Sequence, residues 1–438
     1  MIAKHKLVNF LYLIGFPFYG IGNYVTFTNT FSVGVIFSVI PYLLILVIHF
    51  LDLIYKRRLT PMVNGVYWVT TAYIASLISS YWLGHLVFHS FPGLNPININ
   101  AQSVMFLAPF NAALVVHMYN RSNERFDFAW LTLKSLILLI AVNFVGYVAG
   151  IHNAVHGFEG RINLPFFIVM YDGAHVLSII NLMLLFYLKD YEKAPLRFIL
   201  LALLYVVGLA MMVNINSRLS FMMFLVLSVL FALRLMKVLR GVYAVSLFTM
   251  PLLTSFALLI YQVLSMPFFV AILQRVDKED VTTFNGRTYI WGAVYDWLLE
   301  DRRGFFFGNG YHGQYRLRML DFVADLWGDK HSYNLHMHST FLEVVMDQGL
   351  VGLVLFYLVF WYGFDHFRKK YLADRLEAPL FAAFVYLLFI WQIDIFVSGM
   401  FIGFAILMCL MSAASISPRF ITRTPRKLDG QPVVEEED

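Results

Sequence analysis

The chain has 438 residues, of which 60% are hydrophobic and 13% are charged, with a formal net charge of +5 and a mean hydropathy of +0.70. Soluble domains are closer to half apolar and a quarter charged, so this composition excludes a soluble protein and indicates a polytopic membrane protein. The basic residues lie mainly in short loops between apolar stretches, which argues against a nucleic-acid partner. The single cysteine, Cys409, excludes intrachain disulfides, cysteine metal clusters and paired-thiol redox chemistry.

Apolar stretches of about 17–25 residues, the length that crosses a bilayer, follow one another along the chain. Lys4 and Lys6 precede the first stretch without a small-residue cleavage site after it, so we expect a retained first span rather than a removed signal peptide. No internal repeat divides residues 1–417, which are predicted to form one all-α membrane domain of about twelve spans. The predicted spans are residues 8–28, 32–54, 63–87, 101–119, 128–150, 166–188, 197–214, 219–236, 242–264, 348–365, 378–397 and 400–416.

Basic residues in the short loops predict the orientation of the chain. Lys and Arg gather on the cytoplasmic side of membrane proteins, so both termini are predicted to be cytoplasmic. The tail, residues 418–438, turns from basic to acidic, lacks apolar content and is expected to be disordered. The loops on this side carry Lys4, Lys6, Lys56, Arg57, Arg58, Arg121, Arg125, Lys189, Lys193, Arg197, Lys237, Arg240, Arg368, Lys369, Lys370 and Arg375.

The short loops on the opposite, outer side contain two arginines. Arg161 lies between spans five and six, and Arg218 lies in a very short turn between spans seven and eight. One interpretation is that each side chain reaches lipid headgroups or pairs with an acid such as Glu159. The other is that arginines on a side that otherwise avoids them bind an anionic substrate.

Three ionisable residues are predicted to lie within spans, where they are costly. Asp172 and His175 belong to span six, and Asp394 belongs to the outer part of span eleven. They either line a substrate path or form hydrogen bonds between helices.

One long polar segment, residues 267–340, is predicted to face outward between spans nine and ten. Asn285 and Gly286 can cap an amphipathic helix that starts near Arg287, and the aromatic face of this helix either lies on the bilayer or packs against span ends. A cation in a first helical turn is unfavourable unless an anion binds there. Arg287 is therefore a candidate phosphate ligand, and pairing with a nearby acid such as Asp280 is the alternative.

The rest of this segment contains a charge run, a glycine-rich turn and a histidine pair. Residues 300–303 are interpreted as a solvated turn, and the glycines of residues 308–313 permit tight turning and close backbone approach. Thr340 and Glu343 have capping-box spacing, which predicts Thr340 as the N-cap of a helix. His338 then lies just ahead of this helix, either facing a cleft or serving as a plain loop histidine. His336 and His338 alternate, and no HExxH motif, third ligand or DxD cluster accompanies them, so no metal is expected.

The motifs Arg287-Thr288-Tyr289-Ile290-Trp291, Gly308-Asn309-Gly310 and His338-Ser339-Thr340-Phe341-Leu342-Glu343, the last followed by Gln348-Gly349-Leu350-Val351-Gly352, occur in one order on the outer side. In this respect the chain resembles the O-antigen ligase/polymerase superfamily. The resemblance implies a fold like that of C-type glycosyltransferases, an undecaprenyl-diphosphate-linked glycan donor, and no metal or other cofactor. Arg161, Arg218 and Arg287 would bind the donor diphosphate, and His338 would act as the catalytic base. His336, Glu343 and Asp172 are secondary candidates.

The resemblance leaves two enzymatic functions open. Ser339 stands where the family more often has asparagine, and the RINLPFF stretch after Arg161 lacks the Gly and Asn-Pro of many ligases. These departures favour an inverting polymerase of O-antigen or other surface-polysaccharide repeat units. The alternative is a ligase that transfers the glycan to lipid A-core or another surface acceptor. A transporter or flippase of lipid-linked sugar is disfavoured, because the halves of the chain are unlike and the loop after span six is short.

The polymerase function implies further expectations about partners and location. The partners would be the lipid-linked donor, a lipid-linked or lipid A-core acceptor, membrane lipids and a chain-length regulator. The protein would lie in the bacterial inner membrane with its active site facing the periplasm.

Overall fold

The computed structural model describes residues 4–56, 63–87, 94–123, 126–154, 161–169, 171–237, 241, 287–328, 332, 335–373 and 377–417. Throughout these residues the regular secondary structure is helical, and no strand is formed. Within the same ranges, six helices are long and apolar enough to cross a membrane. The chain is therefore an all-α polytopic membrane protein.

The helices of the bundle lie where the sequence predicts spans. The predicted first span is divided at Ile14 into two consecutive helices, and the predicted ninth span, residues 242–264, falls outside the described residues. The predicted tail, residues 418–438, also falls outside them. The bundle helices are α1 (Lys4–Leu13), α2 (Gly15–Thr28), α3 (Phe31–Lys56), α4 (Gly65–Val87), α5 (Pro96–Tyr119), α6 (Phe128–Val148), α7 (Asp172–Asp190), α8 (Pro195–Ile215), α9 (Arg218–Ala232), α18 (Thr340–Ala373), α19 (Ala378–Ile390) and α20 (Ile402–Ala414), with a 3₁₀ turn η1 (Leu235–Lys237) after α9.

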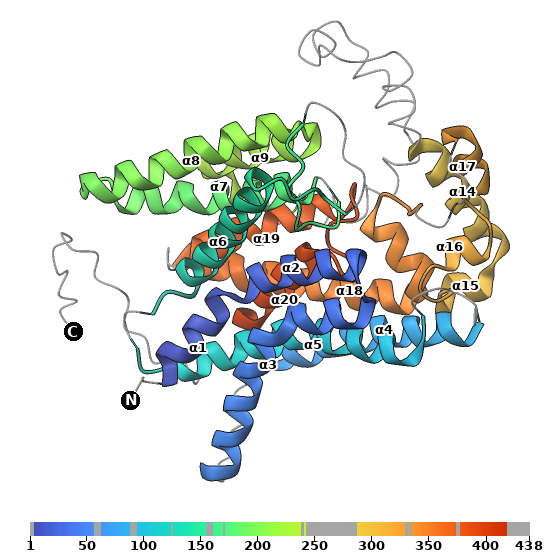
Figure 1. Ribbon diagram of the computed structural model, residues 1–438, viewed down its shortest axis with the longest axis horizontal. Coiled ribbons are helices and arrows are strands. Elements are labelled where there is room, and N and C mark those ends of the chain that lie inside the picture. The colour runs from blue at the N-terminus through green and yellow to red at the C-terminus, as the bar shows by residue number, and fades with distance from the viewer. Residues whose placement is uncertain are drawn as a thin grey trace, which may run out of the picture.

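Short helices form the described part of the outer segment. They gather at one end of the bundle, next to α4 and α18, whereas α1 lies toward the opposite end (Figure 1). The turn between α8 and α9 points toward the same end as these short helices (Figure 1). The helices are α14 (Arg287–Glu300), α15 (Arg302–Phe307), α16 (Gly313–Arg316) and α17 (Asp321–Trp327).

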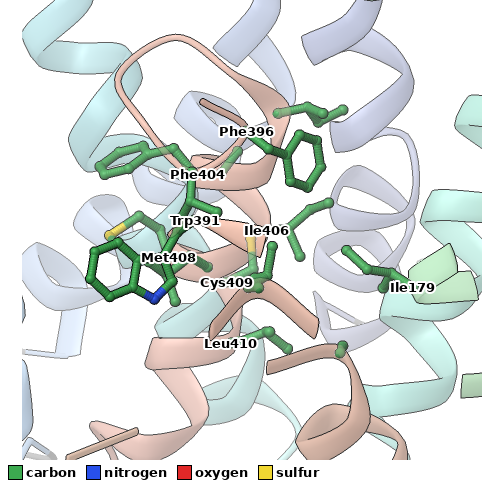
Figure 2. Close-up of a cluster of buried hydrophobic side chains, with 14 of the residues drawn as sticks. Ile179, Trp391, Phe396, Phe404, Ile406, Met408, Cys409 and Leu410 are labelled. Atoms are coloured by element: carbon green, nitrogen blue, oxygen red, sulfur yellow. The ribbon is translucent and has the colours of Figure 1, made fainter. Parts of the chain in front are cut away.

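The core of the bundle surrounds α20. Every residue of this helix is buried, and Figure 2 shows Ile406, Met408, Cys409 and Leu410 packed with Trp391 and other apolar side chains. The Cys409 thiol is directed at the carbonyl oxygen of Pro109 in α5, at 3.8 Å. A helix that is apolar on all sides is suited to a protein core or to a membrane, and here protein side chains surround it.

The predicted span 378–397 is not one helix. α19 ends at Ile390, and residues 391–401, which include Asp394, are irregular but largely buried. α19 and α20 have 13 residues each, fewer than the roughly 20 needed to cross a bilayer. The sequence WQIDIFVSGMF is apolar enough to be read as part of a span. Irregular backbone is tolerated at membrane depth when protein groups satisfy it, and the start of α18 supplies such groups here.

The predicted span 166–188 also begins later than expected. Residues 161–169 are irregular, and α7 starts at Asp172, so Asp172 and His175 lie in its first turn rather than deep within a span. Two asparagines satisfy the irregular backbone. Asn143 Oδ1 accepts from the Phe166 amide at 2.8 Å, and Asn153 Nδ2 donates to carbonyls on either side of Phe166. These side-chain bonds replace the helical bonds that hydropathy alone predicts.

The glycine-rich turn of the outer segment packs against a kink in α18. At Gly349 the backbone has φ 68° and ψ −167°, which interrupts the helix. The Asn309 amide donates to the Met346 carbonyl at 2.8 Å, and the Gly310 amide donates to the Asp347 carbonyl at 3.1 Å. A Cβ at Gly310 would lie 2.5 Å from the Gly84 nitrogen of α4. The predicted close backbone approach is confirmed, and its partners are the carbonyls released by the kink.

The charge run of residues 300–303 is more than a solvated turn. Glu300, Arg302 and Arg303 are exposed, but Asp301 is the N-cap of α15 and accepts from the Gly304 amide at 2.8 Å. Together with hydrogen bonds from neighbouring side chains, this bond holds the pKa of the Asp301 carboxyl below its usual value. Asp301 therefore fixes the start of the helix that leads into the glycine turn.

Candidate functional site

His338 lies in a constrained turn immediately before α18. Its φ is 48°, in the left-handed region that few non-glycine residues adopt, and its side chain is half-buried. The preceding residue, Met337, is held on both sides: its amide donates to Glu343 Oε2 at 3.1 Å, and its carbonyl accepts from Trp291 Nε1 at 3.0 Å. The His336 and His338 rings have centroids 4.2 Å apart. The imidazole of His338 is thus presented from a fixed backbone.

The predicted capping box at the start of α18 is not formed. Thr340 is already helical, and its hydroxyl donates to the Asp394 carbonyl at 2.8 Å instead of capping the helix. Glu343 reaches past Thr340 to the Met337 amide. The Thr340 hydroxyl is drawn away because the irregular segment 391–401 has buried carbonyls. In a helix, these carbonyls would have bonded to backbone amides. Ser339 fills the same need by donating to the Gln392 carbonyl at 2.9 Å.

Arg161 and Arg218 lie at the same end of the bundle as this turn. Arg161 Nη1 donates to Tyr171 Oη at 3.1 Å, and the next residue, Ile162, donates its amide to the Asn214 carbonyl at the end of α8 at 3.4 Å. Arg218 is the first residue of α9 and is exposed. Arg161 is therefore fixed beside the turn from which Arg218 projects. Glu159, its proposed partner, falls outside the described residues.

Arg287 begins α14, as the sequence predicts, but its side chain is outside the described part of the structure. The acids proposed as its alternative partners, Asp280 among them, also fall outside. The aromatic face of α14 is buried: Trp291 is 3% exposed and Trp297 is 7% exposed. This face therefore packs within the protein and does not lie on the bilayer surface.

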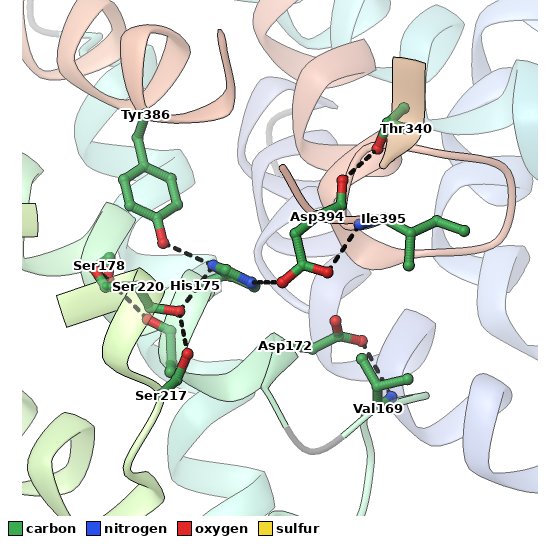
Figure 3. Close-up of polar contacts among 11 residues, drawn as sticks. Val169, Asp172, His175, Ser178, Ser217, Ser220, Thr340, Tyr386, Asp394 and Ile395 are labelled. Atoms are coloured by element: carbon green, nitrogen blue, oxygen red, sulfur yellow. Dashed lines mark hydrogen bonds and ion pairs between the residues drawn. The ribbon is translucent and has the colours of Figure 1, made fainter. Parts of the chain in front are cut away.

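A buried polar cluster joins α7, α9, α19 and the irregular segment 391–401 (Figure 3). The sequence indicates only some of its residues. At its centre, His175 Nδ1 lies 2.7 Å from Tyr386 Oη and 2.9 Å from Ser220 Oγ, and Nε2 lies 3.2 Å from Asp394 Oδ2. Ser217 Oγ adds a contact of 2.7 Å to Ser220. The cost of a polar group inside a span identifies His175 and Asp394 in the sequence. No comparable signal identifies Tyr386 or the two serines.

Asp172 lies beside this cluster and is 1% exposed. One of its oxygens, Oδ2, accepts from the Val169 amide at 3.4 Å. The other, Oδ1, has no hydrogen-bond partner among the described residues. Its carboxylate lies below that of Asp394 in Figure 3. Asp172 is therefore placed near the predicted site residues, as a buried acceptor.

Because of His312, in the outer segment, we expect the stability of the protein to depend on pH. Burial, reinforced by the nearby His336, lowers its pKa to about 3. The unfolded chain binds a proton near its usual pKa of about 6.5, whereas the folded chain does not. Stability is therefore fully present above about pH 6.5 and falls as the pH falls toward 3. Between pH 7.5 and 5.5 we expect a loss of about 1.4 kcal/mol from this residue.

Denaturant unfolding in micelles at both pH values measures this loss. The matched variant is His312→Asn, because His312 has φ 57° and asparagine tolerates that conformation. The variant should lose about 1.4 kcal/mol less than the unsubstituted protein over the same interval. Equal losses in the two proteins would contradict the prediction.

Comparison with known proteins gives a family match for the segment that contains most of the predicted site residues. Residues 200–357 match a family model described as O-antigen ligase. The matched segment includes Arg218, Arg287, His338 and the glycine turn with its partner kink in α18. No curated protein matches the chain.

Proposed function

Because the chain belongs to the O-antigen ligase/polymerase superfamily, we propose that it is a metal-independent glycosyltransferase that uses an undecaprenyl-diphosphate-linked glycan. The family match supports an enzyme of glycosyltransferase type whose donor and acceptor meet in the membrane. In our proposal the enzyme polymerises repeat units of O-antigen or another surface polysaccharide. It works at the outer face of the bacterial inner membrane, with both termini in the cytoplasm.

The observation that carries this proposal is the gathering of the candidate residues at one end of the bundle. Arg161 is fixed beside the turn that precedes Arg218, and a chain of hydrogen bonds runs from the first turn of α9 to the start of α18, two residues after His338. Arg161, Arg218 and His338 thus come from separate elements to the same end of the bundle, which supports a site where a lipid diphosphate and its sugar would lie.

The chemistry of glycan transfer assigns roles to these groups. A diphosphate leaving group carries concentrated negative charge, and arginine guanidinium groups bind phosphate oxygens bidentately while staying charged at any working pH. Arg161, Arg218 and Arg287 would stabilise the charge that develops as the anomeric bond breaks. His338 would accept the proton of the attacking acceptor hydroxyl, since an imidazole titrates near neutral pH. Attack opposite the diphosphate inverts the anomeric configuration.

Three further residues have supporting roles in this proposal. Glu343 holds the Met337 amide and so supports the His338 turn. His336, whose ring contacts that of His338, would help to disperse the proton. Asp172, which is 1% exposed, would support the site from within the fold and would not contact the glycan.

Ligation is the second candidate function, because the matched family model is described as O-antigen ligase and supports a ligase- or polymerase-type role alike. A ligase would use the same donor and the same residues, and only the acceptor differs. The acceptor would be lipid A-core or another surface molecule instead of a second lipid-linked repeat unit. A chain-length regulator is the partner expected of the polymerase.

Purified protein mixed with undecaprenyl-diphosphate repeat units and a metal chelator tests the proposal. Polymerisation is expected to give a ladder of longer lipid-linked glycans. Transfer only after lipid A-core is added would identify a ligase instead. If neither acceptor received sugar, and the protein moved lipid-linked sugar across a vesicle membrane, the enzymatic proposal would be wrong.

A further inference from the structure

His175 joins four separate parts of the fold through its two ring nitrogens. It belongs to α7, its Nδ1 contacts Tyr386 of α19 and Ser220 of α9, and its Nε2 contacts Asp394 in the irregular segment 391–401. The side chains of His175, Ser220 and Tyr386 are at most 1% exposed. A buried polar group is stable only when it is fully hydrogen-bonded, so these contacts define one arrangement of the four elements.

The hydrogen-bonding capacity of the imidazole matches its partners. With a proton on Nε2, His175 donates to the Asp394 carboxylate, and the single lone pair of Nδ1 accepts from one of the two hydroxyls beside it, those of Tyr386 and Ser220. The Ser217 hydroxyl then donates to Ser220 Oγ. Each ring nitrogen of His175 therefore has a hydrogen-bond partner.

A serine, histidine and aspartate in contact resemble a nucleophilic triad, but the burial of these residues argues against that role. Ser220 is fully buried and His175 is 1% exposed, so a glycan has no approach to the serine oxygen. A nucleophile must be accessible to its substrate, because it forms a covalent bond with it. The cluster is therefore better explained by the two parts of the fold that it connects.

Each end of the cluster leads to a residue of the proposed site. On one side Ser220 lies in the first turn of α9, two residues after Arg218. On the other side the Asp394 carbonyl accepts from both the hydroxyl and the amide of Thr340, two residues after His338. Hydrogen bonds through His175 therefore connect the first turn of α9, which begins at Arg218, to the start of α18 beside His338.

We propose that His175 is a positioning residue that sets the separation between Arg218 and His338, an inference that rests on the proposed function. It touches neither donor nor acceptor. It fixes the position of the first turn of α9 relative to the start of α18. The diphosphate and the attacking hydroxyl then meet in the reactive geometry. A displacement of about 1 Å at a reacting centre lowers rates about 100-fold.

His175→Ala tests this role through the separation of turnover from binding. We expect kcat to fall about 100-fold, while the inhibition constant of undecaprenyl diphosphate, a probe of donor binding, changes less than threefold. Asn181→Ala is the matched control. Asn181 is a buried polar residue of the same helix, but its amide contacts Met212 of α8. This variant should show a similar fall in Tm and keep its turnover.

A double-substitution cycle gives a readout that a local packing defect would not produce. Ser220→Ala removes one end of the path, and Thr340→Val removes the hydroxyl bond at the other. Each should lower kcat about 10-fold, and the double variant should lose about as much as either single variant. Substitutions in independent parts of a protein multiply instead, which here means about 100-fold. This cycle decides the question if His175→Ala does not fold.

Multiplying effects in the cycle would overturn the positioning role, as would an active protein whose His175→Ala variant keeps its turnover. A fall in kcat matched by an equal loss of donor binding would also overturn it. If the unsubstituted protein transfers no glycan, the proposed function fails and this inference fails with it. The two failures are therefore distinguished by the activity of the unsubstituted protein.

Discussion

We expect the replacement of the proposed base His338 with asparagine to leave the protein folded and to lower the rate of the proposed glycan transfer by about 10³-fold, a typical contribution of general base catalysis. Asparagine is the informative substitution because His338 has φ 48°, a conformation that asparagine adopts readily and alanine does not. The bonds that hold the turn use the backbone of Met337 and the side chains of Ser339 and Thr340, so they remain. The base is lost, and the turn is kept.

Single-turnover measurement of transfer, with donor binding measured separately, checks this expectation. Donor binding should change little, since the arginines are untouched. His366→Asn serves as the control: His366 belongs to the same helix, α18, but pairs with Glu377 far along it. Retention of more than a tenth of the transfer rate by His338→Asn would show that another group removes the proton.

Replacing Gly349 with alanine is expected to destabilise the protein by about 3–5 kcal/mol. Two costs combine. The backbone at φ 68° and ψ −167° lies in a region that is essentially restricted to glycine. A Cβ would also lie 2.4 Å from the Gly308 nitrogen and 2.5 Å from the Phe306 carbonyl oxygen, and backbone atoms cannot move aside as a flexible side chain can.

Gly328→Ala separates these two costs. Gly328 has φ 71°, but its Cβ would meet nothing within 4 Å, so only the conformational cost remains, about 1–2 kcal/mol. Denaturant unfolding of both variants in micelles measures the difference. If Gly349→Ala destabilised the protein no more than Gly328→Ala, the packing of the glycine turn against the kink would have no energetic importance.

The sequence predicts the bundle better than it predicts the irregular segments within it. Hydropathy identifies the helices because a bilayer requires long apolar runs, and turn residues correctly place the start of α14 at Arg287. Hydropathy fails at residues 166–169 and 391–397, where apolar side chains accompany a non-helical backbone. The bonds that satisfy this backbone come from Asn143, Asn153 and Thr340, which are distant in sequence, and no local pattern reports them.

The candidate site likewise contains residues that local sequence patterns identify and residues that they do not. Charge asymmetry finds Arg161 and Arg218, and turn chemistry finds His338, because each is anomalous in its own neighbourhood. The partners of His175 are ordinary residues in ordinary helices. Ser220 and Tyr386 acquire their importance only when α7, α9 and α19 are packed together. The missed capping arrangement of Thr340 has the same origin, since the competing carbonyl belongs to Asp394, 54 residues away.

The contacts between the glycine turn and the bundle limit how this chain can be combined with segments of a related protein. Gly310 and Tyr311 donate their amides to Asp347 of α18 and Ser80 of α4, so the turn is anchored to two helices from opposite halves of the chain. The outer segment is therefore not a module that can be excised or grafted alone. A chimera that exchanges donor preference must carry matching residues from all three places, and transplants limited to the loop will misfold at this junction.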